Sequence, residues 1–271
     1  MIKVNVIWMC LVGLVYVSGL FLFQNNLLFF PDRKYVPPHQ AQAEMFQEIS
    51  LTAKDGNPIR LWYAQGDKTK PAVLFLHGNA GQIATFAEQL QVITQAGYGV
   101  LAMEYRSFAE VPGKIRQDVI FSDAAESFDF LREKGYPKIV VYGYSFGAAM
   151  AAGLTSLREA DALILTAPFY SLKREVGDKP VPFAKQVLRD EYPSYRYVGK
   201  FTKPLLIITS KKDRLISWKH AQDLFNLSPS TQKEIFVLDK PNHNSLYYSG
   251  ANLPYILEFL KKFDASLNKK F

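Results

Sequence analysis

The sequence has almost no cysteine and little histidine. Its 271 residues include one cysteine, Cys10, and four histidines. A single cysteine excludes an intrachain disulfide and a thiolate metal cluster. Because Cys10 lies in an apolar N-terminal run, a cysteine nucleophile in the folded body is excluded as well. The histidines are widely spaced and no two stand four residues apart on a helix, so we predict no metal site.

Acidic side chains are outnumbered by basic ones. The chain has 25 Asp and Glu against 32 Lys and Arg, a net charge of +7. Basic residues gather late in the sequence, for example in SKKDR (210–214) and at 261–262. Such runs are either solvated lysines or a face attracted to anionic lipid headgroups. Nucleic-acid binding is disfavoured, because aromatic and basic residues do not alternate on a recognisable module.

One long uncharged run stands near the N-terminus. Residues 4–23, VNVIWMCLVGLVYVSGLFLF, match in helical length the hydrocarbon core of a bilayer. We therefore predict that residues 1–31 form an uncleaved membrane anchor and its exit. A cleaved signal peptide could use VSG (17–19), but the LFLF that follows would remain as an apolar stub. A lipoprotein would need small residues before Cys10, where the sequence has IWM.

The side of the membrane that holds the rest of the chain stays open. Lys3 and the terminal amine on one side face Arg33 and Lys34 on the other, which is nearly a tie under the positive-inside rule. Residues 25–38, NNLLFFPDRKYVPP, are typical of an interfacial exit, with aromatics at headgroup depth and prolines that end the helix.

From residue 47 onward, apolar strand-like runs alternate with helical patterns. The runs 46–53 and 58–65 flank the turn signal KDGN and predict an antiparallel hairpin. Further buried strands are predicted at 72–77, 98–105, 138–144, 162–167, 204–210 and 234–239. Helices are predicted at 83–96, 118–135, 146–158, 217–228 and 252–264. Near-continuous apolar strands require cover on both faces, so we predict one α/β domain over residues 32–271 with a predominantly parallel sheet.

Residues 168–203 interrupt this alternation. The interval is longer than a simple helix-to-strand connection and is rich in aromatics, including Phe169, Phe183 and Tyr192. An aromatic insertion at the carboxyl end of a strand is typical of a small lid over a substrate site. The alternative is a helix whose aromatic side chains pack on the body of the domain.

The sequence GYSFG (143–147) predicts a nucleophile at Ser145. Glycines stand two residues before and two after the serine, and the motif falls between a predicted strand and a predicted helix. Side chains at 143 and 147 would collide with neighbouring backbone at so sharp a turn. The alternative is a structural turn whose serine only caps the helix.

A serine nucleophile needs a histidine base and an orienting carboxylate. Asp213 follows the predicted strand 204–210, and His243 follows the strand 234–239, so we predict both on loops at the edge of the sheet that holds Ser145. His220 lies in a predicted helix and His39 precedes the folded body. Asp239 could also orient the base, but it stands at the end of its own strand and is therefore only a minor competitor of Asp213.

The oxyanion of the reaction needs two hydrogen-bond donors. The backbone N–H of Phe146, at the start of the helix after Ser145, is one by geometry. The second is predicted in the loop HGNAG (77–81), from the backbone N–H of Asn79 or, next to it, of Gly78. His77 is interpreted as a buried residue that shapes this loop.

Taken together, these motifs resemble α/β-hydrolase-fold serine hydrolases, in the HGNAG branch related to depalmitoylase-like hydrolase-domain proteins. The resemblance extends over most of residues 47–264 and rests on these segments: LFLHGNAG (74–81), EYRSF (104–108), DAAESFDFL (123–131), VYGYSFGAAMA (141–151), APFYSL (167–172), PLLIITSKKDRLIS (204–217) and NHN (242–244). It implies hydrolysis of an ester or thioester through an acyl-serine, without metal or organic cofactor. The chain departs from the pattern at SFAEVPGK (107–114), where relatives have a glycine-rich run.

Three functions remain in view at this point. A membrane-anchored serine esterase or thioesterase acting on a small-molecule or lipid acyl ester is favoured. A serine peptidase on the same fold is the second, and an anchored scaffold without turnover is the third. The sequence leaves the acyl-chain length and the oligomeric state open.

Overall fold

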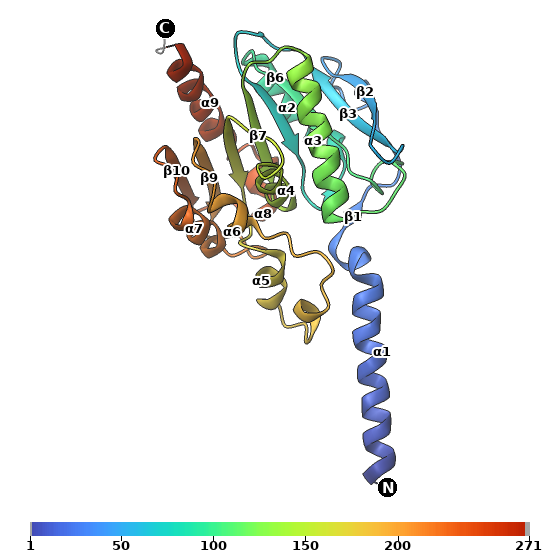
Figure 1. The fold of residues 1–271 in the computed structure, drawn as a ribbon. Coiled ribbons are helices and arrows are strands. Elements are labelled where there is room, and N and C mark those ends of the chain that lie inside the picture. Colours follow the sequence, from blue (N-terminus) through green and yellow to red (C-terminus); the bar gives the residue numbers. More distant parts are fainter. Residues whose placement is uncertain (1, 269–271) are drawn as a thin grey trace.

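The protein is described by a computed structural model that covers residues 2–268 and consists of a long N-terminal helix attached to an α/β body (Figure 1). Residue 1 of the predicted anchor and residues 269–271 of the predicted domain lie outside the described residues. The body contains an eight-stranded sheet in the order β10-β9-β8-β7-β4-β6-β3-β2. The α/β-hydrolase fold predicted from the sequence is confirmed, including the predominantly parallel sheet with an antiparallel start.

The strands lie where the apolar runs predicted them. β2 (Gln47–Thr52) and β3 (Pro58–Ala64) form the antiparallel hairpin, and β3 pairs antiparallel with β6. The parallel strands are β4 (Ala72–Leu76), β6 (Gly99–Met103), β7 (Ile139–Tyr144), β8 (Ala162–Thr166), β9 (Leu205–Ser210) and β10 (Lys233–Leu238). Every residue of β4, β6, β7, β8 and β9 is buried, as expected for strands covered on both faces.

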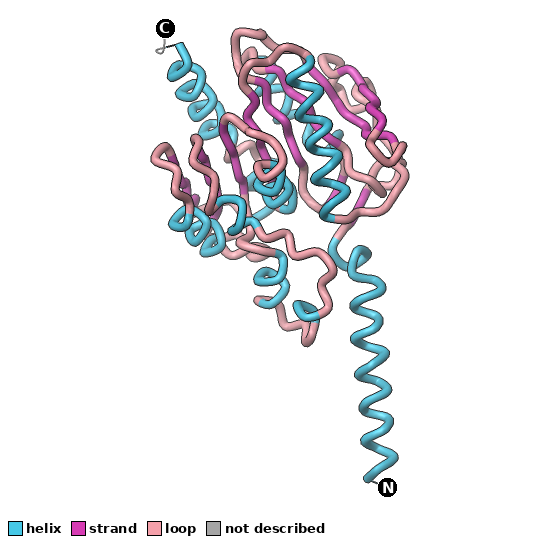
Figure 2. The backbone as a smooth tube through the Cα atoms, in the orientation of Figure 1, coloured by secondary structure: helices cyan, strands magenta, loops and turns pink. Residues whose placement is uncertain are grey.

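Helices cover both faces of the sheet (Figures 1 and 2). One face packs α3 (Gln117–Glu133), α4 (Phe146–Leu154) and α7 (Trp218–Leu227), and the other packs α2 (Ala87–Gln95), α8 (His243–Tyr248) and α9 (Leu253–Asn268). Alternate residues of each strand enter the two apolar clusters, so Leu74 and Leu76 lie in one and Val73 and Phe75 in the other. The sheet is therefore a rigid support whose carboxyl edge carries the loops.

The N-terminal helix α1 (Ile2–Leu28) projects from the body at the carboxyl edge of the parallel strands (Figure 1). Its segment Trp8–Leu28 is long and apolar enough to cross a membrane, and almost none of it is buried. The chain then forms β1 (Phe30–Pro31), which pairs in parallel with β5 (Ala80–Gly81). This small ladder fastens the end of α1 to the loop after β4.

The insertion predicted at 168–203 contains α5 (Leu172–Gly177), the 3₁₀ turn η2 (Ala184–Gln186) and α6 (Ser194–Val198), which leads back towards β9. A further 3₁₀ turn, η1 (Ile83–Phe86), precedes α2. Some aromatic side chains of the insertion pack on the body of the domain, and others are exposed, as a lid would have them. Tyr192 is buried in the core, whereas Phe183 is exposed at the tip. The insertion lies beside the carboxyl edge of the sheet, next to α1 (Figure 1).

Candidate active site

The turn between β7 and α4 has the geometry that the GYSFG motif predicts. Ser145 adopts φ 55° and ψ −116°, a left-handed conformation that is strained for a residue with a side chain. A Cβ at Gly143 would lie 2.2 Å from the carbonyl oxygen of Gly147, and one at Gly147 would lie 2.0 Å from that of Leu76. Only glycine fits at both positions, because the backbones of α4 and the neighbouring strands approach so closely.

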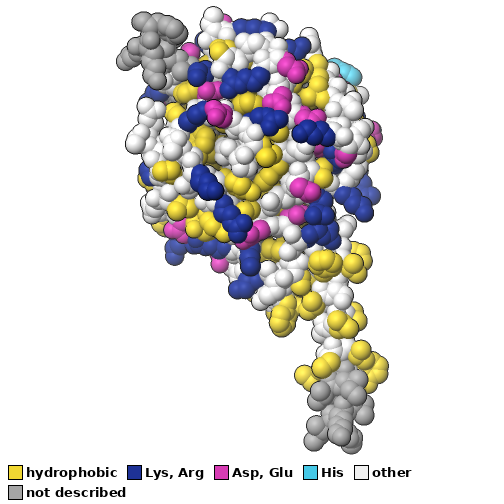
Figure 3. Space-filling view, viewed as in Figure 1, with side chains coloured by type: hydrophobic (Ala, Val, Ile, Leu, Met, Phe, Trp, Pro, Cys, Tyr) yellow, Lys and Arg dark blue, Asp and Glu magenta, His cyan; other side chains and the backbone are white. Residues whose placement is uncertain are grey.

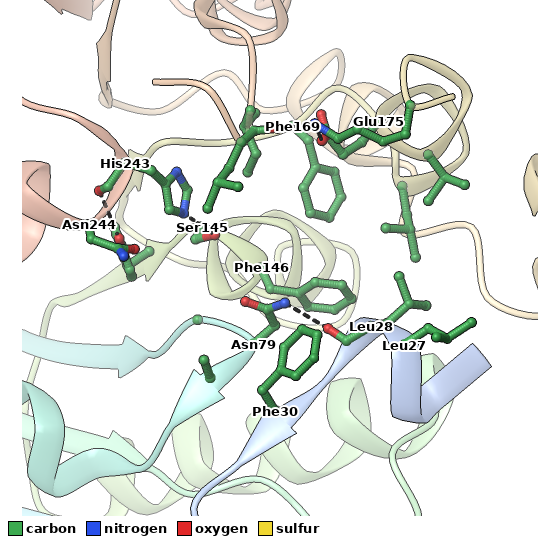
Figure 4. Close-up of a pocket in the computed structure, with 18 of the residues that line it drawn as sticks. Leu27, Leu28, Phe30, Asn79, Ser145, Phe146, Phe169, Glu175, His243 and Asn244 are labelled. Atoms are coloured by element: carbon green, nitrogen blue, oxygen red, sulfur yellow. Dashed lines mark hydrogen bonds and ion pairs between the residues drawn. The ribbon is translucent and has the colours of Figure 1, made fainter. Parts of the chain in front are cut away.

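The structure brings together the three side chains predicted to be catalytic. Figure 4 shows two of them, Ser145 and His243. His243 Nε2 lies 3.0 Å from Ser145 Oγ, and His243 Nδ1 lies 2.6 Å from Asp213 Oδ2. The other carboxylate oxygen of Asp213 accepts hydrogen bonds from the backbone N–H groups of Leu215 and Ile216, at 2.9 and 2.8 Å. These bonds fix the carboxylate and leave one oxygen for the imidazole.

One local prediction about this constellation is wrong. His243 was expected on a loop, but it is the first residue of the short helix α8. Asn242 caps this helix, and the side chains and backbones of Asn242 and Ser245 bond reciprocally. The sequence signal for the capping box was present in NHNS, but the helix it opens has only six residues and shows too little periodicity to be recognised.

Tyr144 holds the backbone of His243 from below. Its hydroxyl donates to the carbonyl oxygen of His243 at 3.0 Å. Burial raises the pKa of Tyr144 well above its usual range, so the hydroxyl stays protonated and remains a donor. The residue before the nucleophile thereby fixes the position of the histidine.

The two predicted oxyanion donors belong to different elements, Phe146 to the start of α4 and Asn79 to the loop after β4. Phe146 and Asn79 both line the cavity above the serine. Within the described part of the chain, neither backbone N–H has a protein acceptor. Among the described residues both N–H groups are therefore unpaired, as binding of an oxyanion would require, and their role as donors stays a prediction.

The loop after β4 is held from two directions. His77 is fully buried, and its Nε2 lies 2.9 Å from the Glu104 carboxylate, while the Tyr105 hydroxyl donates to its carbonyl oxygen at 2.7 Å. On the other side, the Asn79 side-chain amide donates to the carbonyl oxygen of Leu28 at 2.7 Å (Figure 4). His77 thus lies in the position expected of a residue that shapes the loop.

The end of α1 is a part of the site that sequence reasoning missed. Leu27, Leu28 and Phe30 line the cavity together with Ser145 and His243. Figure 4 shows these three residues below and beside Phe146, opposite the histidine. A two-residue ladder between segments fifty residues apart gives no periodic signal in a sequence, so nothing indicated that the anchor joins the site.

The cavity has a volume of about 470 Å³ and is mainly apolar. The loops and α1 line one side, and the insertion lines the other with Phe169, Leu172, Glu175, Val176 and Lys179. Among the described lining residues Glu175 is the one carboxylate, and it pairs with Lys179 at 2.8 Å. The cavity therefore suits an apolar substrate group, with Asn79 and His243 near Ser145 and the Glu175–Lys179 pair on the side of the insertion.

The competing candidates lie away from Ser145. His220 is buried in α7, where its Nδ1 accepts from the backbone N–H of Tyr170 and its Nε2 lies 3.0 Å from Asp178. Asp239 is exposed and pairs with Lys211 at 2.9 Å. His39 is exposed. Within the described residues there is also no group of three His, Cys, Asp or Glu side chains able to hold a metal ion.

Comparison with known proteins supports the assignment of the fold. The sequence model of a family described as "Serine aminopeptidase, S33" (Hydrolase_4) matches residues 67–197. The uncharacterized protein Rv2307c of Mycobacterium tuberculosis is 30% identical over 210 residues, which cover 73% of this chain and 74% of that protein. The uncharacterized membrane protein YNL320W of Saccharomyces cerevisiae is 25% identical over 271 residues, covering 91% and 92% of the two chains.

A solved structure extends the comparison to three dimensions. The esterase Pf2001 of Pyrococcus furiosus superposes with a TM-score of 0.68 over 87% of this chain and 97% of the esterase, at 21% identity, so the likeness concerns the fold. The strand order and the turn at Ser145 agree with this fold. The chain therefore belongs to the α/β-hydrolase family, in the group described as Hydrolase_4.

Proposed function

We propose that the protein is a membrane-anchored serine hydrolase that cleaves carboxylic esters or thioesters through an acyl-serine intermediate. The observation that carries this proposal is the continuous hydrogen-bonded series from Asp213 through His243 to Ser145, at the floor of an apolar cavity. Ser145 is the nucleophile, His243 the general base, and Asp213 the group that orients the imidazole. The backbone N–H groups of Phe146 and Asn79 are the oxyanion donors.

The reaction follows from these positions. Ser145 Oγ attacks the carbonyl carbon while its proton passes to His243 Nε2, and the developing oxyanion accepts the two backbone hydrogen bonds. The tetrahedral intermediate collapses, and the leaving alcohol or thiol takes the proton from His243. A water molecule, deprotonated by the same imidazole, then attacks the acyl-serine. This step releases the carboxylic acid and restores the Ser145 hydroxyl.

The lining of the cavity supports an acyl substrate over a peptide. An aminopeptidase needs a carboxylate to bind the substrate's α-ammonium group, and Glu175 is already paired with Lys179. Leu27, Val176 and Phe169 offer instead an apolar surface for a chain of methylene groups. The relation to depalmitoylase-like proteins that the HGNAG loop implies agrees with this preference, as does the esterase Pf2001 of the same fold.

Two observations support the membrane anchor. The segment Trp8–Leu28 has the length and composition of a spanning helix, and its apolar side chains are exposed on the described surface. A relative that covers nearly the whole chain, YNL320W, is named as a membrane protein. The α/β body is attached directly to this helix through β1.

The test is hydrolysis of p-nitrophenyl esters from acetate to palmitate by the detergent-solubilised full chain. We expect turnover that depends on chain length, and a loss of at least about 10⁴-fold in kcat for Ser145→Ala and His243→Ala. An amide series of aminoacyl p-nitroanilides is measured in parallel. Turnover of the anilides alone would replace the esterase with a peptidase, and equal rates for wild type and Ser145→Ala would contradict the proposal.

A further inference from the structure

The tip of the insertion lies against the middle of the predicted membrane helix. The hydroxyl of Tyr16 donates to the carbonyl oxygen of Pro182 at 3.1 Å. Nearer the body, the side chain of Gln24 accepts from the backbone N–H of Arg189 at 2.8 Å and donates to the carbonyl oxygen of Val187 at 3.4 Å. Three residues of the insertion are thus tied to two positions on α1, eight residues apart.

The residues at this tip are apolar and exposed. The sequence KPVPFAK (179–185) places Val181 and Phe183 between two lysines, and these two side chains are 42% and 60% exposed. Phe183 has φ 62°, a left-handed conformation that a bulky residue rarely adopts, and the neighbouring backbone folds back as η2. In Figure 3, hydrophobic side chains gather where the lower end of the insertion meets α1, with Lys and Arg side chains above them.

The depth of the tip follows from its contact with Tyr16. Tyr16 lies seven residues before Phe23, after which the polar residues 24–26 (QNN) interrupt the apolar run. A helix rises 1.5 Å per residue, so the contact is about 10 Å inside the apolar run that ends at Phe23. Amphipathic segments that lie in a membrane interface bury their apolar side chains about 5–10 Å deep. Lys185 is exposed, and its long stem keeps its ammonium group among the headgroups while the tip lies deeper.

We propose that residues 180–186 insert beside α1 into the bilayer leaflet nearest the α/β body, so that lipid covers Val181 and Phe183. The cavity opens between these two membrane-contacting elements, because Leu27 and Leu28 of α1 line one side and Leu172, Val176 and Lys179 of the insertion line the other. An acyl chain therefore enters laterally from the leaflet. The entry of the tip into the bilayer is inferred from its contacts with α1, whereas the identity of the entering group rests on the proposed function.

The entry of the tip into the bilayer is tested by attaching a fluorophore to the tip and measuring its quenching by nitroxide-labelled lipid. Cys10→Ser removes the native thiol, and Phe183→Cys or Leu157→Cys then carries a single nitrobenzoxadiazole label in the full chain. Leu157 is the matched control, because it is an exposed apolar residue that follows α4, at the edge of the sheet away from Ser145. Both proteins are reconstituted in vesicles of phosphatidylcholine and phosphatidylglycerol that contain nitroxide-labelled lipid.

We expect strong quenching at position 183 by nitroxide near the headgroup, and quenching at 157 by aqueous iodide only. Iodide quenching of equal strength at both positions, with no effect of the nitroxide lipid, would overturn the proposal. This readout does not depend on catalysis, so it stands or fails separately from the hydrolase assignment.

A kinetic comparison tests lateral entry. In the paired variant Val181→Ser, Phe183→Ser, hydrolysis of a long-chain acyl ester dissolved in the vesicles should fall about tenfold or more, while hydrolysis of a water-soluble acetate ester stays within about twofold. Leu157→Ser should change neither rate. A fall in both rates to the same extent would mean that the tip supports the fold of the site and not access from the bilayer. If the wild-type protein hydrolysed neither ester, this result would count against the proposed function alone.

Discussion

At the scale of single residues, the site depends on Gly143 and Gly147, which allow α4 to approach the sheet. Gly147 is the more sensitive, because a Cβ there meets the backbone oxygens of Leu76 and His77, which no side-chain rotation can relieve. Gly177 is a suitable control, since a Cβ there meets only the flexible end of Lys185 at 3.1 Å.

We expect Gly147→Ala to reduce kcat for an acetate ester by about 10²-fold or more, because displacement of α4 moves Ser145 Oγ and the Phe146 N–H together. The free energy of unfolding should fall by about 2–4 kcal/mol, the range of overpacking in a core. Gly177→Ala should leave both quantities nearly unchanged. Urea titration and steady-state kinetics measure the two effects, and a fully active Gly147→Ala enzyme would show that the elbow is not the source of the serine's position.

At the scale of elements, the end of α1 acts as part of the hydrolase body. β1 pairs with β5, and the Leu28 carbonyl holds the side chain of Asn79, whose backbone N–H is a proposed oxyanion donor. In addition, Phe29 packs edge-on against Phe146 with ring centroids 4.7 Å apart. We therefore propose a functional boundary near residue 25 in place of the one predicted between residues 31 and 32.

Two fragments test this boundary. The fragment from residue 25 keeps the last turn of α1 and β1, whereas the fragment from residue 32 loses both. In the fragment from residue 32 the Asn79 loop lacks its contacts with Leu28 and β1 and is held only from the side of His77. We therefore expect kcat for a water-soluble ester to be about tenfold lower in this fragment. Circular dichroism should report the same α/β fold in both. Equal kcat values would mean that the β4 loop is positioned by His77 and Glu104 without help from α1.

The elements also differ in how far they could be predicted from the sequence. Strands β4, β6, β7, β8 and β9 could be predicted because their burial on both faces leaves continuous apolar runs. Ser145 could be placed because it directly follows β7, and Asp213 because it stands three residues after the end of β9. The helix at His243 and the contact of Asn79 with Leu28 depend on local capping and on a short tertiary ladder. Neither leaves a periodic pattern, so the wall formed by α1 could not be predicted.

At the scale of the whole molecule, the membrane helix, the insertion and the catalytic edge of the sheet lie on one side (Figure 1). The strands direct their carboxyl ends towards α1, so Ser145 lies near the place where the chain leaves the proposed bilayer. This arrangement allows a single chain to bind a membrane and to act on a group held within it.

The most direct test of the central claim is active-site labelling of the intact chain in a membrane. The full-length protein in vesicles is treated with a fluorophosphonate and digested, and the modified peptide is identified by mass spectrometry. The account predicts one adduct, on Ser145, that is absent from Ser145→Ala and strongly slowed in His243→Ala, where the base is missing. An unlabelled Ser145 in folded protein, or an adduct on another residue, would contradict the claim that this serine is a nucleophile.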